Sequence, residues 1–327
     1  MELLARYREP VLREIDRLVG GPPSPVLTMC RYHLGLADAH GRPANGSPGK
    51  MLRSALCLAM CEALGGDVRR CLPVAVSVEL IHRTSLVFDD IQDRSPLRNA
   101  RPCVSAIWGH VQAINAGMAL SCYSRMALVE SAIPQKARIQ GHLEQAVLHL
   151  CAGQQMDIAF RDIPPTPQQY TEMVLRKTGI LLGAACKVGA MAAEQPDAVW
   201  GRAALFGEAL GVAFQYQDDY LGVWGDAKEL GKEPDDLAQR RCGVPAVLAM
   251  DDDPRFRALF CGSHPLDDKA TAMLQERLDA LSIRKQTQTA VLMAGGDALE
   301  QLRRLALPAS WEAAFTGLVD FAVKRAS

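Results

Sequence analysis

The sequence predicts an all-α protein. Aromatic residues make up only 6% of its 327 residues, Ala and Leu are abundant, and apolar residues recur three and four positions apart. Breaks rich in Pro and Gly, at 20–25, 41–49 and 162–167, separate these periodic stretches and are too short for flexible linkers. No internal repeat or low-complexity tract interrupts the pattern. One large helical domain covering residues 1–327 is therefore the simplest interpretation.

The helices are predicted from the apolar period and from the breaks that bound each stretch. DIPPTP and EQPD, for example, are typical helix-start sequences before residues 167 and 197. In chain order, the predicted helices cover 3–19, 49–65, 70–93, 105–131, 135–160, 167–193, 197–223, 242–250, 268–281, 286–303 and 308–325.

Composition excludes several classes of protein. Lys plus Arg total 36 and Asp plus Glu total 37, so no charge excess points to nucleic acid as a partner. Ten cysteines occur without a CxxC pair, which favours free, mostly buried thiols over a zinc site. The charged N-terminal stretch is unlike a signal peptide, and no run reaches the roughly 20 apolar residues of a membrane span. A cytoplasmic protein is expected.

A predicted apolar helix at 70–93 ends in three aspartates, Asp89, Asp90 and Asp93. At 100° per residue Asp89 and Asp93 share a face, and His82 falls within about 20° of it. Carboxylates four residues apart repel each other and oppose the helix dipole at this end, so a cation is expected beside them. Mg²⁺ fits, because it takes one or two carboxylates and completes its shell with water and phosphate oxygens. The alternative for this segment alone is a solvated acidic helix end, although guanidinium groups suited to phosphate follow at Arg94, Arg98 and Arg101.

A second apolar helix, at 197–223, ends the same way in Asp218 and Asp219, with Asp226 just beyond it. If the two acidic helix ends face each other across a bundle, they can hold several Mg²⁺ ions and clamp one diphosphate. Each basic residue of the chain by itself is more often a solvated surface charge. Candidates for the remaining phosphate contacts are Lys50, Arg53, Lys177, Lys232, Arg240 and Arg241.

Together these motifs resemble, in the same order, those of the trans-isoprenyl diphosphate synthases. They are GKMLR at 49–53, DDIQDRSPLRNARP at 89–102, GQQMD at 153–157, KTG at 177–179 and FQYQDDYLGVWGDAKELGKEPDDL at 214–237. The resemblance implies the isoprenoid synthase fold, a single helical bundle around a deep apolar cavity, and a homodimer. It also implies a Mg²⁺-dependent reaction in which an allylic diphosphate ionises, isopentenyl diphosphate attacks the cation through its double bond, and a proton is lost.

The resemblance also assigns roles to residues, position by position. It implies three Mg²⁺ ions with substrate bound, held by Asp89, Asp93 and Asp218. It implies that Arg98, Lys177 and Lys232 bind the allylic diphosphate. It implies likewise that Lys50, Arg53 and His82 bind the diphosphate of isopentenyl diphosphate. The three aspartates with Lys177 and Lys232 are the expected catalytic residues. Further substrate contacts are expected from Asp90, Arg101, Thr178, Gln215 and Asp219, and the cavity wall from Thr84, Ser85 and Phe214.

The sequence departs from the family pattern at several positions. Asn99 and Ala100 follow Arg98 where the family usually has a second arginine and a glycine. That arginine helps to hold isopentenyl diphosphate, and losing a charge-assisted contact costs about 1.5–3 kcal/mol, or one to two orders of magnitude in affinity. Arg101 is a candidate substitute. In two other departures, Gly222 replaces the third aspartate of the second acidic motif, and Arg241 stands where lysine is common. Met118 stands where the family often has Asp, and nothing in the sequence explains this difference.

Thr84 and Ser85 are small side chains where an aromatic residue would stop chain growth, which favours a product longer than farnesyl; the predicted product is geranylgeranyl diphosphate. Two alternatives stay open: a terpene cyclase acting on a preformed allylic diphosphate, suggested by the missing arginine, and a weakly active homologue serving as a regulatory subunit. Lys50, Arg53 and His82 favour elongation, because a cyclase has no use for an isopentenyl site. A helical scaffold without activity would require every motif to be coincidental.

Overall fold

The computed structural model describes residues 2–44, 46, 49–226, 234–262 and 264–324. The chain divides into two compact units. Unit 1 comprises Met1–Glu144 and Ala185–Trp200, and unit 2 comprises Gln145–Ala184 and Gly201–Ser327. The division cuts three helices, namely α7 (Lys136–Ala159), α9 (Ile180–Ala192) and α10 (Asp197–Trp224).

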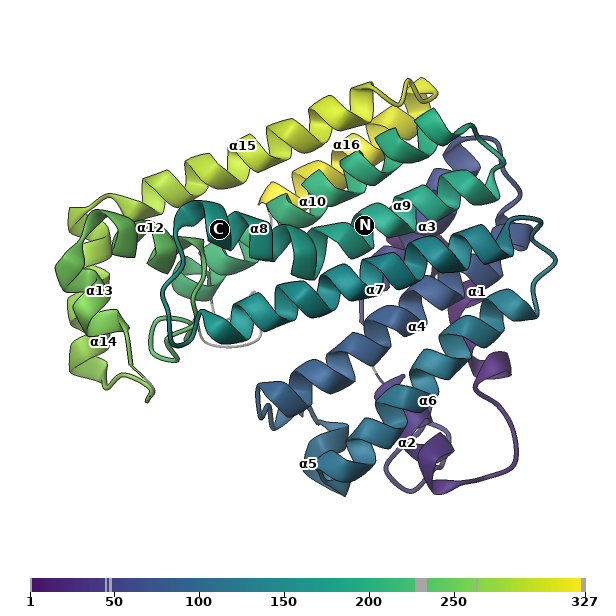
Figure 1. The fold of residues 1–327 in the computed structure, drawn as a ribbon, viewed down its shortest axis with the longest axis horizontal. Coiled ribbons are helices and arrows are strands. Elements are labelled where there is room, and N and C mark those ends of the chain that lie inside the picture. Colours follow the sequence, from purple (N-terminus) through teal and green to yellow (C-terminus); the bar gives the residue numbers. More distant parts are fainter. Residues whose placement is uncertain (1, 45, 47–48, 227–233, 263, 325–327) are drawn as a thin grey trace. The chain divides into compact units, whose positions relative to one another are not determined.

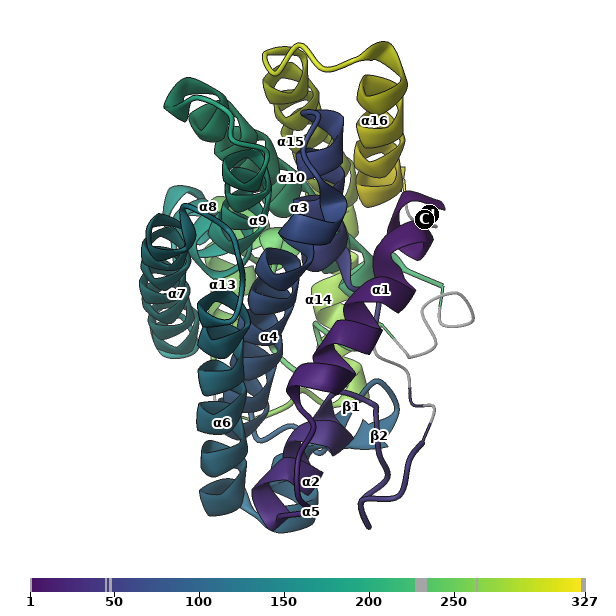
Figure 2. The same cartoon turned by 90° about the vertical axis from the view of Figure 1, so that its right-hand side faces the viewer.

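Unit 1 is built around one long buried helix, α4 (Val68–Gln92). Its other complete elements are α1 (Glu2–Leu18), α2 (Pro25–His33), α3 (Leu52–Ala63), β1 (Leu97–Arg98), β2 (Arg101–Pro102), α5 (Val104–Trp108) and α6 (His110–Val129). Helix α4 packs along α6 and against α3 and α1 (Figures 1 and 2). Leu56 and Leu58 from α3, Leu80 from α4 and Leu120 from α6 are fully buried in this core, and burial of such side chains is the main force that holds helices together.

Unit 2 combines long and short helices around a second core. Its complete elements are α8 (Pro167–Val174), the π-helical turn η1 (Leu175–Gly179), α12 (Val244–Asp252), α13 (Pro254–Phe260), α14 (Asp268–Ala280), α15 (Ile283–Arg303) and α16 (Ala309–Lys324). Helix α12 packs against α8, α13 and α15, and α15 pairs with α16 (Figure 1). Phe256 from α13, Leu274 and Leu278 from α14, and Ile283 at the start of α15 are fully buried in this core.

The prediction of an all-α protein is confirmed, with local differences. In the described residues the only paired strands form the two-residue hairpin β1–β2, which the sequence prediction missed. The prediction also missed α2 and α13, although each begins with a capping residue followed by proline, Ser24-Pro25 and Asp253-Pro254. The predicted helix at 105–131 is broken into α5 and α6 at Gly109, which has a φ of 81°.

Helix α4 tests the prediction that no segment could span a membrane. Among the described residues it is the one helix long and apolar enough to qualify by length and composition. In its most apolar window 61% of the residues are buried inside the structure. This is the burial expected of a helix at the centre of a folded core.

Candidate functional site

The first acidic cluster lies at the C-terminal end of α4, where two neighbouring aspartates have different surroundings. Asp90 is buried, and its Oδ1 accepts hydrogen bonds from Nε and Nη2 of Arg98 at 2.8 and 2.7 Å. Asp93 is exposed and Asp89 is half-buried, one turn apart on the same face of the helix. Asp90 thus holds the hairpin residue Arg98, whereas Asp89 and Asp93 form the carboxylate pair that the sequence predicted.

The hairpin β1–β2 carries the two arginines that follow this cluster. Arg98 and Arg101 are paired across it, and its two-residue turn consists of Asn99 and Ala100, with φ values of 51° and 59°. Positive φ at both positions is the geometry of a type I′ turn, which asparagine tolerates and which glycine adopts at the lowest cost. The turn favours glycine at position 100, and it leaves Ala100 strained.

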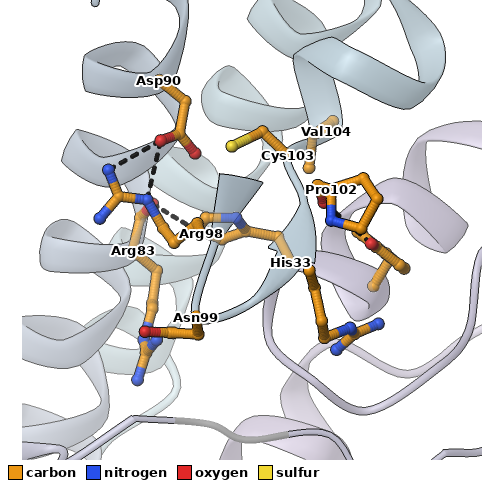
Figure 3. A pocket seen from close by; sticks show the side chains of 10 residues that line it. His33, Arg83, Asp90, Arg98, Asn99, Pro102, Cys103 and Val104 are labelled. Atoms are coloured by element: carbon orange, nitrogen blue, oxygen red, sulfur yellow. Dashed lines mark hydrogen bonds and ion pairs between the residues drawn. The ribbon is translucent and has the colours of Figure 1, made fainter. Parts of the chain in front are cut away.

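A basic pocket lies beside the hairpin in unit 1 (Figure 3). The Arg101 guanidinium stacks on the Tyr32 ring at 4.3 Å from its centroid, and Nη2 donates to the Ala37 carbonyl at 3.3 Å. Arg83 is buried and paired with Glu79 at 2.8 Å. The residues lining the pocket are Tyr32, His33, Arg83, Asp90, Arg98, Asn99, Arg101, Pro102, Cys103 and Val104.

The positive charge of this pocket comes from arginine alone. His33 lies 2.9 Å from the Arg83 carbonyl oxygen through Nε2. Burial, together with the charges of Arg83, Arg98 and Arg101, lowers the pKa of His33 to about 3. A neutral imidazole therefore donates Nε2–H to the carbonyl, and His33 adds no charge at neutral pH.

Arg53 and His82, predicted to bind the same diphosphate, are in direct contact. Nη1 of Arg53 lies 3.0 Å from Nε2 of His82. Arginine can only donate, so Nε2 of His82 accepts and its proton is on Nδ1. Burial and the neighbouring Arg53 hold the pKa of His82 well below its usual range, while burial lowers the pKa of Arg53 only to about 10. At neutral pH the pair is one cation beside a neutral imidazole that carries its proton on Nδ1. Lys50 is exposed just before α3.

The residues predicted to line the cavity lie on two helices. Ser85 donates its hydroxyl to the His82 carbonyl at 2.9 Å, and Thr84 has a buried hydroxyl with no hydrogen-bond partner among the described residues. Both lie on α4 within two turns of Asp89. Phe214 is half-buried on α10 in unit 2.

The second acidic cluster, on α10 in unit 2, repeats the division of roles seen in the first. Asp219 is buried and accepts hydrogen bonds from the Tyr170 hydroxyl at 2.5 Å, from Gln215 Nε2 at 2.9 Å and from the Val244 backbone at 3.1 Å. Burial raises its pKa to about 7, and these three donors oppose the rise. Asp218 is less buried than Asp219. The second aspartate therefore ties α8 and α12 to α10, and the first is the candidate ligand.

Lys177 and Thr178 lie in the π-helical turn η1, a kind of irregularity that is frequent at functional sites. The Lys177 ammonium contacts Asp157 Oδ2 at 2.6 Å. A Cβ on Gly153, one turn before Asp157 on α7, would come within 2.4 Å of the Lys177 backbone nitrogen. Glycine is thus required for α7 to approach the turn this closely. Thr178 donates to Gln215 Oε1 at 3.3 Å, which joins the turn to the Asp219 network, whereas Lys232 lies outside the described residues.

These carboxylates suit a hard divalent cation. Across the described residues, no three His, Cys, Asp or Glu side chains come together as a closed metal cage. Asp89, Asp93 and Asp218 are all oxygen donors, and one or two carboxylates are what Mg²⁺ takes from a protein when phosphate and water complete its shell. In each cluster, taken by itself, the carboxylate donors fit magnesium, whereas zinc prefers His or Cys ligands.

Several functional candidates were not found by sequence reasoning. Asp157 was visible as the last residue of GQQMD, but nothing marked it as the partner of Lys177. His33 and Tyr170 gave no local signal, since each contacts a residue about 50 positions away in the chain. Arg83 pairs with Glu79 one turn earlier on α4, a spacing that was readable but that did not single it out. Such partners depend on how helices pack and are not readable from spacing.

Comparison with known proteins extends these findings. The model of a family described as polyprenyl synthetase matches residues 42–276. Over 284 residues the chain is 35% identical to the geranylgeranyl diphosphate synthase of Mycobacterium tuberculosis, covering 85% of this chain and 81% of that protein. Over 240 residues it is 36% identical to the (2E,6E)-farnesyl diphosphate synthase of Mycobacterium bovis, covering 73% of this chain and 66% of that protein.

Solved structures agree with the sequence relatives. A polyprenyl synthetase from Streptomyces coelicolor matches with a TM-score of 0.91 at 30% identity over 98% of both chains. A geranylgeranyl pyrophosphate synthetase from Pyrococcus horikoshii matches with a TM-score of 0.87 at 28% identity, over 99% of this chain and 98% of that one. The fold is thus that of these synthases.

Proposed function

Because this chain belongs to the polyprenyl synthetase family and is a prenyltransferase of isoprenoid synthesis, we propose that it condenses an allylic diphosphate with isopentenyl diphosphate to give geranylgeranyl diphosphate or a product of similar length. The observation that carries the proposal is the shared design of the two aspartate pairs. In each pair the second aspartate is buried and bound to its surroundings, and the first is more accessible. The relatives named above are synthases and give no support to the terpene cyclase alternative.

Asp89, Asp93 and Asp218 are the proposed magnesium ligands, with three ions in the substrate complex. Bound magnesium would supply positive charge against the negative charge that develops on the departing diphosphate. Asp90 and Asp219 support these ligands indirectly, since each fixes the end of its helix to a neighbouring segment.

Arg98, Lys177 and Lys232 are proposed to bind the allylic diphosphate. Arg98 is paired with Asp90, and Lys177 is paired with Asp157. Both cationic side chains are therefore positioned before the substrate binds. Thr178 and Gln215 belong to the same hydrogen-bonded group as Asp219, and we assign them to the substrate-binding wall.

Lys50, Arg53 and His82 are proposed to hold isopentenyl diphosphate, with Arg101 at the neighbouring pocket. Neutral His82 can donate Nδ1–H to a phosphate oxygen while Arg53 contributes charge. In the reaction the allylic C–O bond breaks, the isopentenyl double bond forms the new C–C bond, and the released diphosphate accepts a proton. The cavity wall assigned to Thr84, Ser85 and Phe214 would limit the access of water to the cation.

For the protein as a whole, we propose a single functional domain over residues 1–327, a homodimer and a cytoplasmic location, without a nucleic-acid partner. The near balance of 36 basic and 37 acidic residues supports the last point.

Product analysis by mass spectrometry tests the proposal. The enzyme is incubated with Mg²⁺ and each allylic primer, with and without isopentenyl diphosphate. Elongated diphosphates that require both Mg²⁺ and isopentenyl diphosphate are expected. Hydrocarbons or terpene alcohols formed from the allylic diphosphate alone, or no product with any primer, would overturn it.

A double-variant measurement tests whether both clusters act on one diphosphate. Asp89→Asn and Asp218→Asn should each lower kcat by about 100-fold or more. Applied together they should cost much less than the product of the two effects, because groups that act as a unit are not additive. Independent, multiplicative losses would assign the two clusters to different substrates.

A further inference from the structure

Gly222 leaves the second acidic cluster with one carboxylate fewer than the first. It follows Asp218 by four residues on α10, as Asp93 follows Asp89 on α4. Residues four apart share a helix face, with Cβ atoms about 5–6 Å apart. The first cluster therefore presents two carboxylates one turn apart, and α10 by itself presents one.

The side chain of Asp236 occupies the place that residue 222 leaves empty. A Cβ built on Gly222 would lie 1.7 Å from Asp236 Oδ2 and 2.5 Å from its Cγ. The Asp236 carboxylate thus stands where a side chain at position 222 would begin, one helical turn from Asp218 and on the same face. Any residue other than glycine at 222 would displace it.

Asp236 is fixed in this position by its own neighbours. Its backbone N–H donates to the Gly222 carbonyl at 3.2 Å, and its carbonyl accepts from the Arg241 backbone at 2.8 Å. The Arg241 guanidinium contacts Asp236 Oδ1 at 2.9 Å, and Oδ2 is the oxygen nearest to Gly222. The Asp236 side chain is 18% exposed. Gly222 and Arg241, two departures from the family pattern, are therefore parts of one arrangement.

We propose that Asp236 rebuilds the missing half of the second acidic pair and provides a carboxylate oxygen to the divalent cation that Asp218 holds. The inference rests on the proposed function and adds a residue to it. Two carboxylates one turn apart match the pair on α4, and their charge is partly offset by Arg241, which limits repulsion when no cation is bound. The competing explanation is structural: Asp236 would only fasten the segment after α10 to the helix end.

Cation binding separates the two explanations without relying on activity. Mg²⁺ is titrated calorimetrically into the full-length enzyme saturated with inorganic diphosphate. Asp236→Asn should weaken Mg²⁺ binding by about tenfold or more, the effect expected for losing one charged ligand. Asp235→Asn is the matched control, because Asp235 precedes Asp236 and also contacts Arg241, at 3.4 Å. The Mg²⁺ affinity of Asp235→Asn should stay within about threefold of that of wild type. Equal changes in Mg²⁺ affinity in the two variants would overturn the proposal.

A positional exchange gives a second test that a merely structural role would not pass. Asp236→Ala vacates the space, and combining it with Gly222→Asp returns a carboxylate to the same face from the helix itself. The double variant should bind Mg²⁺ within about threefold of wild type, and Asp236→Ala alone should stay weak. If the exchange restores nothing in a protein whose circular dichroism matches wild type, the proposal fails. If wild type itself binds no Mg²⁺ with diphosphate, the proposed function fails instead.

Discussion

Replacing Asn99 by arginine should add a contact to isopentenyl diphosphate at its proposed binding site. Asn99 lines the basic pocket of unit 1 with Arg83, Arg98 and Arg101. Arg98 is neutralised by Asp90 and Arg83 is paired with Glu79. The described contacts of Arg101 are neutral, namely the Tyr32 ring and the Ala37 carbonyl. The pocket thus holds about one uncompensated positive charge, and a second guanidinium would double it.

The size of the effect follows from one charge-assisted phosphate contact. Such a contact is worth about 1.5–3 kcal/mol, which lowers KM for isopentenyl diphosphate by about 10- to 100-fold if KM follows binding. The substitution should also lower the folding stability by about 1 kcal/mol, because position 99 has a φ of 51° and arginine tolerates a positive φ less well than asparagine does. KM for the allylic primer should change by less than about threefold, since Arg98 and Asp90 are untouched.

Steady-state kinetics with isopentenyl diphosphate varied at saturating primer measures the effect. Asn99→Gln is the matched control, with a longer side chain and no charge. If Asn99→Arg and Asn99→Gln have the same KM for isopentenyl diphosphate, the pocket does not hold its diphosphate and the argument is wrong.

Three further predictions concern single residues. Ala100→Gly should stabilise the protein by about 0.5–1 kcal/mol, because glycine relieves the strain of the turn. The control is Ala272→Gly at an exposed position of α14, which should destabilise the protein by about 1 kcal/mol. A lower melting temperature for Ala100→Gly than for wild type would contradict the prediction. His33 has a folded pKa of about 3, below its unfolded value of about 6.5, so the unfolded chain binds the proton first as the pH falls. Below pH 6.5 the contribution of His33 to the free energy of unfolding should fall by up to about 1.4 kcal/mol per pH unit. Denaturant unfolding at pH 7.5 and 5 should therefore show that this free energy depends less on pH in His33→Gln than in wild type. An unchanged pH dependence would exclude His33 as the cause. Ser85→Phe should shorten the main product seen by mass spectrometry, and an unchanged length would place the cavity floor elsewhere.

The elements that the sequence predicted well are those with a local signal. The long helices were predicted because an apolar period of three to four residues extends over many turns. Asp89 and Asp93 were predicted as a pair for the same reason, since their spacing alone puts them on one face. Elements with weak periodicity were missed: α13 has only seven residues and each hairpin strand only two.

By itself, the sequence determined the helical class, the two acidic helix ends and the order of motifs that identifies the family. Only the tertiary structure decided which aspartate of each adjacent pair is buried, because burial depends on partners far along the chain, such as Tyr170 for Asp219. It likewise decided that Asp236 fills the space beside Gly222. Spacing along a helix fixes the direction of a side chain, but the groups it meets are set by the packing of other segments.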